Sequence, residues 1–103
     1  MNYIGLIILV GIILLQGGCS GTGKSFNTSK IESIVNETST RADIKKMFGE
    51  PFKTGIQNGQ PIWIYEDHYY SIIGRDTSKD LIIIFGPKGV VQSHQFMTSE
   101  PNL

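Results

Sequence analysis

Few residues in this chain of 103 amino acids have the chemistry for catalysis or metal binding: one cysteine, Cys19, and two histidines, His68 and His94. Asp67 and Ser71 lie near His68 in the sequence. Neither histidine has a second His, Cys or Glu at a spacing typical of a zinc site, and no Gly-x-Ser-x-Gly sequence is present. We therefore predict no catalytic residue, no metal site and no cofactor. Both histidines are expected to be solvated or hydrogen-bonded side chains on strands.

A phosphate-binding pattern occurs at residues 18–25, where GCSGTGKS satisfies G-x-x-x-x-G-K-S. In such a loop, backbone N–H groups surround the phosphates and the lysine, here Lys24, reaches the β- and γ-oxygens. The stretch IWIYED at residues 62–67 imitates the acidic strand that holds Mg²⁺. A P-loop requires a parallel sheet with crossover helices of about a dozen residues. Because the residues after 25 predict consecutive strands without helices between them, we expect no nucleotide binding.

The first 18 residues form an uncharged leader, and all nine basic and nine acidic residues lie after it. The zero net charge gives the chain no electrostatic footprint for nucleic acid. The leader is purely apolar from Ile4 to Leu15. As a helix this stretch would measure about 18 Å, against about 30 Å for the hydrocarbon core of a bilayer. Such a run is typical of a secretory signal peptide, with a signal-anchor helix as the alternative.

The end of the leader resembles the lipobox of bacterial lipoprotein signal peptides. Gly17 and Gly18 match its two small positions, and Cys19 matches the cysteine that receives a diacylglyceryl group. The resemblance implies lipidation of Cys19 and signal cleavage between Gly18 and Cys19. Ser20 rather than Asp after the cysteine implies sorting to the outer membrane. The alternative for Cys19 is a buried or free thiol.

The rest of the chain predicts two short helices followed by three strands. The pattern S-x-x-E from Ser29 predicts a helix over 30–36, and T-x-x-D from Thr40 predicts a second helix that stops at Gly49. Strands are expected over 61–70, 81–85 and 90–97, with a turn at Asn58-Gly59. This order predicts an α+β fold in which two short helices pack on one face of a three-stranded antiparallel sheet (ααβββ), preceded by a signal peptide. The expected segments are a signal peptide (1–18), a lipidated tether (19–28), the α+β domain (29–97) and a disordered tail (98–103).

Three stretches of this domain form a further pattern: TSTRADIKKMFGEP at 38–51, WIY at 63–65, and LIIIF at 81–85 before GVV at 89–91. Their order and spacing resemble the SmpA/OmlA family, also called BamE-like. Members of that family are small outer-membrane lipoproteins that face the periplasm. The resemblance implies a non-enzymatic lipoprotein, held on the outer membrane by its lipid anchor, that binds an envelope protein in outer-membrane protein assembly or envelope maintenance. The partner it suggests is the β-barrel assembly machine.

The alternation of side chains along the strands predicts an unusual second face. With Trp63 and Tyr65 facing the helices, the residues that face away include four isoleucines: Ile62, Ile64, Ile82 and Ile84. The open face of such a sheet is normally polar. Either the tether, the loop 71–79 or the tail covers these side chains, or they bind a partner protein or a second copy. They are the candidate partner-binding residues.

A second candidate function uses the aromatic side chains of the first strand. Trp63, Tyr65, Tyr69 and Tyr70 could form a binding strip for a small ligand, or for an enzyme that the protein inhibits. Strands favour these residue types in any case. The alternative function is therefore a small-ligand or inhibitor-type binding lipoprotein on the same fold.

Overall fold

The structure, a computed structural model, describes residues 19–100. The expected signal peptide and the last three residues lie outside this range. The fold is α+β, as predicted. The elements in order are β1 (Cys19–Gly23), the 3₁₀-helix η1 (Thr28–Ser33), α2 (Arg41–Phe48), β2 (Lys53–Gln57), β3 (Gln60–Ser71), β4 (Thr77–Phe85) and β5 (Val91–Thr98). Within residues 19–100, no helix is long and apolar enough to cross a membrane.

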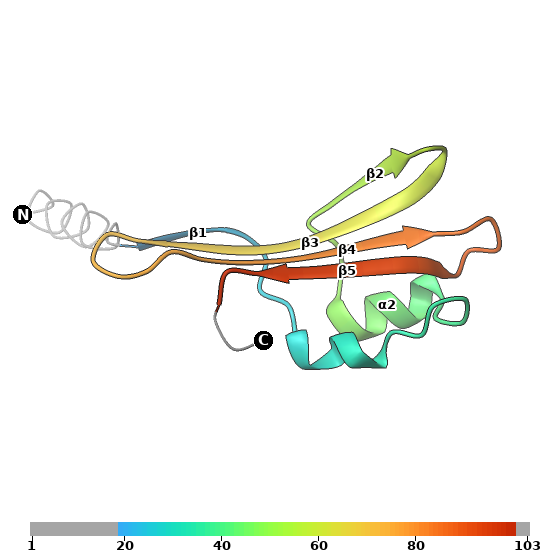
Figure 1. Ribbon diagram of the computed structural model, residues 1–103, viewed down its shortest axis with the longest axis horizontal. Coiled ribbons are helices and arrows are strands. Elements are labelled where there is room, and N and C mark those ends of the chain that lie inside the picture. Colours follow the sequence, from blue (N-terminus) through green and yellow to red (C-terminus); the bar gives the residue numbers. More distant parts are fainter. Residues whose placement is uncertain (1–18, 101–103) are drawn as a thin grey trace, which may run out of the picture.

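The sheet is antiparallel throughout and is built around β3 (Figure 1). Its order is β1-β3-β4-β5, and β2 also pairs with β3. β1 pairs with residues 67–71 of β3, and β2 pairs with residues 60–64. The two strands therefore lie end to end along the same edge of β3. The predicted strands over 61–70, 81–85 and 90–97 are confirmed as β3, β4 and β5.

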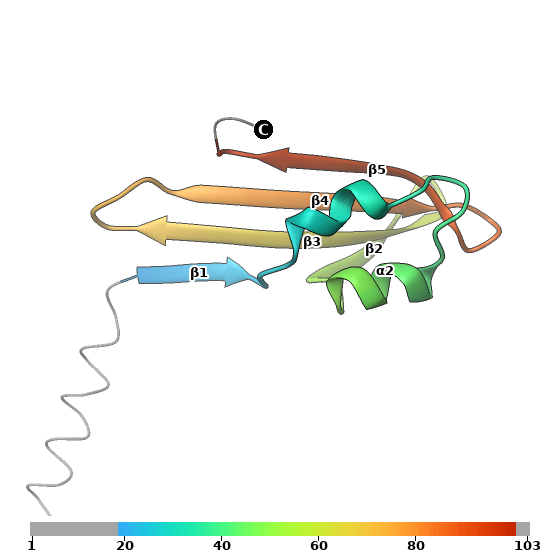
Figure 2. The same ribbon diagram turned by 90° about the horizontal axis from the view of Figure 1, so that it is seen from below.

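Both helical elements cover one face of this sheet (Figure 2). Packed between them and the strands is a single hydrophobic core. Phe26, Phe48 and Tyr65 form an aromatic cluster at one end of it, with ring centroids 5.5–6.4 Å apart. The buried core residues are Ile34, Ile44, Phe48, Tyr65, Leu81, Ile83, Phe85 and Val91.

The predicted capping of α2 is confirmed in detail. The Thr40 hydroxyl accepts a hydrogen bond from the Asp43 N–H at 3.1 Å, and the Asp43 carboxylate accepts one from the Thr40 N–H at 2.9 Å. Hydrogen bonding to Thr40 holds the pKa of Asp43 below its ordinary value, with the backbone N–H of Thr40 as the larger cause and its side chain as the smaller one. Gly49 ends the helix with φ 81°, a conformation that favours glycine. Ile44 and Phe48 then point into the core.

The first helix differs from its prediction in type and position. It is a 3₁₀-helix over Thr28–Ser33, not a helix over 30–36, and its N-cap is Asn27 instead of Ser29. The Asn27 side chain accepts hydrogen bonds from both the N–H and the hydroxyl of Ser29. Ser29 therefore donates to the cap and does not form the predicted capping box with Glu32. Beyond η1 the chain is extended at Ile34.

Two strands were not expected from the sequence. The segment expected to begin the tether forms β1, and the residues before the Asn58-Gly59 turn form β2. The expected tail also continues the fold: the Ser78 N–H donates to the Ser99 hydroxyl, and Glu100 forms an ion pair with Lys79 at 3.3 Å. The described sheet is therefore wider and longer than the three-stranded prediction.

Candidate functional site: the open face of the sheet

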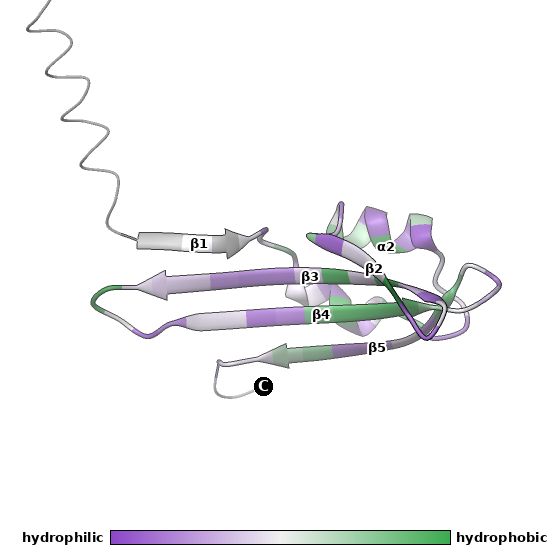
Figure 3. Ribbon diagram, turned by 90° about the horizontal axis from the view of Figure 1, so that it is seen from above, coloured by the Kyte–Doolittle hydropathy of each residue, from purple (hydrophilic) through white to green (hydrophobic). Residues whose placement is uncertain are grey.

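The four isoleucines predicted to face away from the helices form two cross-strand pairs. Ile62 lies opposite Ile84, and Ile64 lies opposite Ile82. Directly paired residues point to the same side of a sheet, and their neighbours along each strand point to the other. Trp63 and Tyr65, with the β4 residues paired to them, lie on the helix-covered side. The four isoleucines therefore share the opposite side, here called the open face. Figure 3 looks onto this face and shows hydrophobic colour over the adjacent ends of β3 and β4.

β2 covers part of this apolar area. Gly55 pairs with Ile62, and a Cβ on Gly55 would lie 3.4 Å from the Ile62 Cγ2, so the β2 backbone packs beside this side chain. Ile62 is consequently only 9% exposed, while Ile64, Ile82 and Ile84 are half-buried. β1 pairs with residues 67–71 of β3, and the loop after β3 follows Ser71, so both lie at the other end of the sheet from the isoleucines (Figure 1). β1 and this loop therefore do not supply the cover considered from the sequence, and the partial cover comes instead from β2, which was not predicted.

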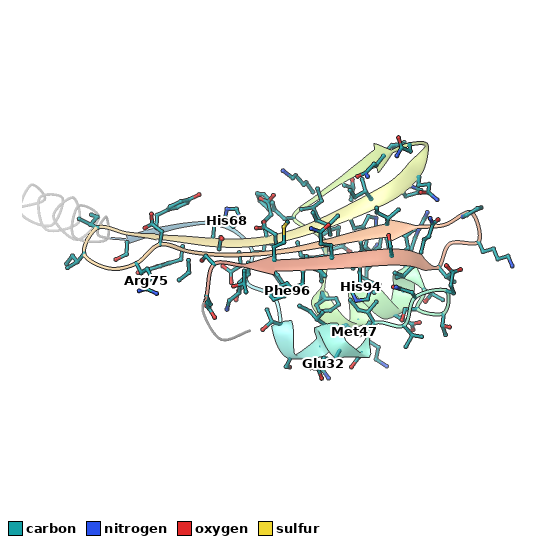
Figure 4. All side chains as sticks on the ribbon, viewed as in Figure 1. Glu32, Met47, His68, Arg75, His94 and Phe96 are labelled. Carbon is teal, nitrogen blue, oxygen red and sulfur yellow. The ribbon has the colours of Figure 1, made fainter. Side chains whose placement is uncertain are left out.

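The open face continues from the isoleucines into a polar half. Glu66 lies directly opposite Asp80, and His68 is the next residue of β3 on the same side. The His68 Nε2 lies 2.9 Å from a carboxylate oxygen of Asp80, and the Lys53 Nζ lies 3.2 Å from a carboxylate oxygen of Glu66. Each carboxylate therefore has a partner. Figure 4 shows His68 on the side of the sheet away from the helices.

This polar half includes a set of side chains that could hold a divalent cation. Donor atoms of Glu66, His68 and Asp80 all lie within 4.8 Å of one another. Zinc binds such donors at about 2.0–2.2 Å, which limits their separation to about 4.4 Å, so the side chains would need to close slightly. Lys53 and His68 already partner the two carboxylates. This set was not predicted because Asp80 lies far along the chain from Glu66 and His68. The i, i+2 spacing of Glu66 and His68 was the one local signal.

The remaining residues considered for chemistry are not brought together. Asp67 alternates with His68 and so lies on the helix-covered side. The Ser71 hydroxyl accepts hydrogen bonds from the N–H groups of Ile73 and Gly74. His94 lies on the helix side of the sheet (Figure 4), where its Nδ1 is 2.7 Å from the Asn36 side-chain oxygen. The arrangement around His68 therefore does not make a nucleophile–base–carboxylate triad.

The aromatic residues of β3 do not form one exposed strip. Trp63 packs against Phe85, with ring centroids 4.8 Å apart. Tyr65 is buried and donates a hydrogen bond to the Gly49 carbonyl at 2.8 Å. Burial, followed by the charge of Glu50, raises the pKa of Tyr65 to about 12. A small-ligand site built on Trp63 and Tyr65 would have to open the core, which weakens support for that alternative.

The phosphate-binding pattern has a different context from a P-loop. Residues 19–23 form β1, which is antiparallel to β3, and the Lys24 N–H donates to the Glu66 carbonyl at 2.9 Å. A cavity of about 170 Å³ does lie beside Lys24. Its other lining residues include Phe26 and Gly49. Because Gly49 is at the C-terminal end of α2, the helix dipole there disfavours an anion such as phosphate.

Comparisons of this chain with protein-family models, with curated proteins and with solved structures found no match. The resemblance to the SmpA/OmlA family therefore stays a prediction from the sequence.

Proposed function

We propose that this protein is a lipid-anchored envelope lipoprotein on the periplasmic face of the outer membrane, where it binds another protein through the open face. The observation that carries the proposal is the two cross-strand isoleucine pairs, Ile62 with Ile84 and Ile64 with Ile82, on the side that neither η1 nor α2 covers. Water normally meets polar residues on such a face. An apolar area with polar side chains beside it is typical of a protein-binding surface.

The shape of this surface favours a protein over a small molecule. Small-molecule sites are concave and enclose most of the ligand. The isoleucines instead lie on strands β3 and β4, and the cavity beside Lys24 opens elsewhere. Met97, opposite Asp80 on β5, adds an exposed apolar side chain to the same face. A folded partner with its own apolar patch fits such a surface.

The proposed lipid anchor would place the open face at a defined distance from the membrane. Cys19 is the first residue of β1 and pairs with Ser71 at the far end of β3. At about 3.3 Å per residue, Ile64 then lies about 23 Å along the strand from the anchored end. A lipid on Cys19 would hold the isoleucines above the membrane surface, within reach of an envelope partner. By the resemblance to the SmpA/OmlA family, we propose the β-barrel assembly machine as that partner.

The test uses a photo-crosslinking amino acid at Gln95, an exposed residue that pairs with Ile82 and so shares the open face. In Gram-negative cells that express the full chain, we expect a crosslink to one envelope protein, identified by mass spectrometry. The double variant Ile64→Ser and Ile82→Ser should abolish that crosslink with an unchanged circular dichroism spectrum. The matched control replaces Val35 and Ile56, exposed apolar residues elsewhere, by serine and should keep the crosslink.

Two results would contradict this proposal. An equal crosslink in the Ile64/Ile82 variant would show that the open face does not bind the partner. A soluble enzyme as the crosslinked protein would favour the inhibitor-type alternative. Deletion of the protein should also sensitise cells to detergents and bile salts, because a defect in outer-membrane assembly makes the envelope generally leaky.

A further inference from the structure

The loop between β3 and β4, residues 72–76, is here called the β3–β4 tip, and it carries the most exposed large apolar side chains in the described part of the chain. Ile72 is 80% exposed and Ile73 is 97% exposed. Tyr69 and Tyr70, in β3 just before the tip, are also exposed. Single exposed apolar residues are ordinary, but two adjacent isoleucines at the end of a hairpin form a protruding apolar point.

This tip lies at the same end of the sheet as the proposed lipid anchor. Cys19 pairs with Ser71, the residue directly before Ile72. Figures 1 and 2 show the start of β1 beside the tip, at the end of the sheet that extends beyond α2. A lipid on Cys19 would therefore bring Ile72 and Ile73 to the membrane surface without any change in the fold.

Hydrogen bonds inside the tip satisfy backbone N–H groups that a poorly hydrated environment would otherwise leave unpaired. The Ser71 hydroxyl accepts the N–H groups of Ile73 at 3.3 Å and Gly74 at 2.9 Å. The Asp76 carboxylate accepts the N–H of Ser71 at 3.0 Å. Unpaired backbone groups are costly in lipid, and these three N–H groups have partners inside the protein. The same contacts hold the turn while its isoleucines point outward.

We infer that the β3–β4 tip inserts Ile72 and Ile73 into the lipid surface beside the anchor, giving the protein a second, non-covalent membrane contact. Tyr69 and Tyr70 would then lie at the headgroup level, where an aromatic ring with a hydroxyl is favoured. A diacylglyceryl group already holds a protein on the membrane, and an additional apolar contact beside it orients the anchored protein. This inference rests on the proposed lipidation of Cys19.

The test places an environment-sensitive fluorophore next to the isoleucines without replacing them. The full chain is produced in Gram-negative cells as Arg75→Cys, labelled through that thiol, and reconstituted into vesicles of phosphatidylethanolamine and phosphatidylglycerol. We expect a blue shift of the emission and quenching by spin-labelled lipid. The variant Ile72→Ser and Ile73→Ser should lose both signals. A label at Lys88→Cys, in the exposed loop between β4 and β5, should report water in either background.

The parent chain separates failure of this inference from failure of the anchor. Its single cysteine is Cys19. A diacylglyceryl group on Cys19 leaves no free thiol, so the parent must remain unlabelled and the mass of its N-terminal peptide must show the lipid. If the parent chain is labelled, Cys19 carries no lipid, and the inference is then wrong together with the proposed anchor. If Cys19 is lipidated and the Arg75→Cys label reports water, the tip does not insert and the proposed function stands.

Lipid composition and partner binding provide the remaining outcomes. Insertion driven by apolar side chains predicts the same blue shift in phosphatidylcholine vesicles. A shift that needs phosphatidylglycerol would mean recognition of headgroup charge and would overturn the inference. A blue shift in the absence of vesicles, at a concentration where the protein forms dimers, would assign the tip to contact with a second copy and would equally overturn it.

Discussion

The two faces of β3 and β4 carry similar types of residue but differ in how far those residues are buried. On the helix-covered side, β4 presents Leu81, Ile83 and Phe85, and all three are fully buried. On the open face the same strand presents Ile82 and Ile84, which are half-buried. Residue type therefore does not distinguish the two sides. What distinguishes them is cover: among residues 19–100, η1 and α2 cover one side, and β2 covers part of the other.

The polar contacts divide in the same way. On the helix-covered side they fix the cover in place: the Ser39 hydroxyl accepts the Val35 N–H, and the Ser39 carbonyl accepts the Val91 N–H. On the open face, the contacts of His68 and Lys53 with carboxylates are partly exposed pairs. Buried contacts of the first kind stabilise a fold, whereas exposed pairs contribute little. We expect the helix-covered side to determine stability and the open face to determine binding.

The largest expected effect tests this division with two adjacent residues of one strand. Ile83→Ala empties a fully buried site and should lower the free energy of unfolding by about 3–4 kcal/mol. Ile84→Ala removes the same atoms from a half-buried site and should cost about 1 kcal/mol. Urea denaturation of both variants measures the difference. Equal losses would show that the open face is as well packed as the core.

A second prediction uses the buried hydroxyl of Tyr65. Tyr65→Phe removes the hydrogen bond to the Gly49 carbonyl and should cost about 1–2 kcal/mol near neutral pH. The pKa of Tyr65 is raised from 10.0 to about 12 in the folded protein. Between these values the unfolded chain releases the proton while the folded chain keeps it, so the stability contributed by the neutral phenol is complete below about pH 10 and is lost as the pH rises toward 12.

Unfolding curves of wild type and Tyr65→Phe at about pH 8 and about pH 11 measure this contribution. The advantage of the wild type should shrink at the higher pH, and the shared titration of lysines cancels in the comparison. An advantage that stays constant would mean that Tyr65 ionises in the folded protein as easily as in the unfolded chain, against its burial on the helix-covered side.

A third prediction loosens the cover itself. Thr40→Ala removes the cap of α2 and should cost about 1 kcal/mol, whereas Thr38→Ala, in the exposed loop before it, should cost almost nothing. The pKa of Asp43 is lowered in the folded state, so its stabilising contribution is present above 3.8 and is lost as the pH falls below that value. Thr40→Ala keeps the backbone N–H that contributes most to this shift and removes only the hydroxyl, so it should flatten the loss of stability in acid only in part. A variant with the same acid dependence as the wild type would show that the Thr40 hydroxyl does not contribute to the lowered pKa of Asp43.

Local signals predicted the parts of the fold that local physics determines. The capping box at Thr40 and the turn at Asn58-Gly59 depend on neighbouring residues, and both were predicted correctly. β1 and β2 were missed because their residues, CSGTG and KTGIQ, have weak strand preference and few apolar side chains. They form strands by pairing with the exposed edge of β3, a contact that depends on the whole sheet.

The candidate site could also be predicted only in part from the sequence. Alternation along β3 and β4 was enough to place Ile62, Ile64, Ile82 and Ile84 on one face. Their partial cover depends on β2, so the degree of exposure was not accessible from the sequence. The contact between His68 and Asp80 was also missed, because only the register of the two strands brings them together.

The smallest expected effect concerns the polar half of the open face. Glu66→Gln gives up a surface ion pair with Lys53 but also relieves the repulsion between Glu66 and Asp80, so the free energy of unfolding should change by less than about 0.5 kcal/mol. Wild type and variant are compared in EDTA and in zinc. Because Lys53 and His68 already partner the two carboxylates, we expect zinc to leave both unfolding midpoints unchanged. Stabilisation by zinc of the wild type alone would assign a metal to Glu66, His68 and Asp80, and would make the polar half of the open face a binding site in its own right.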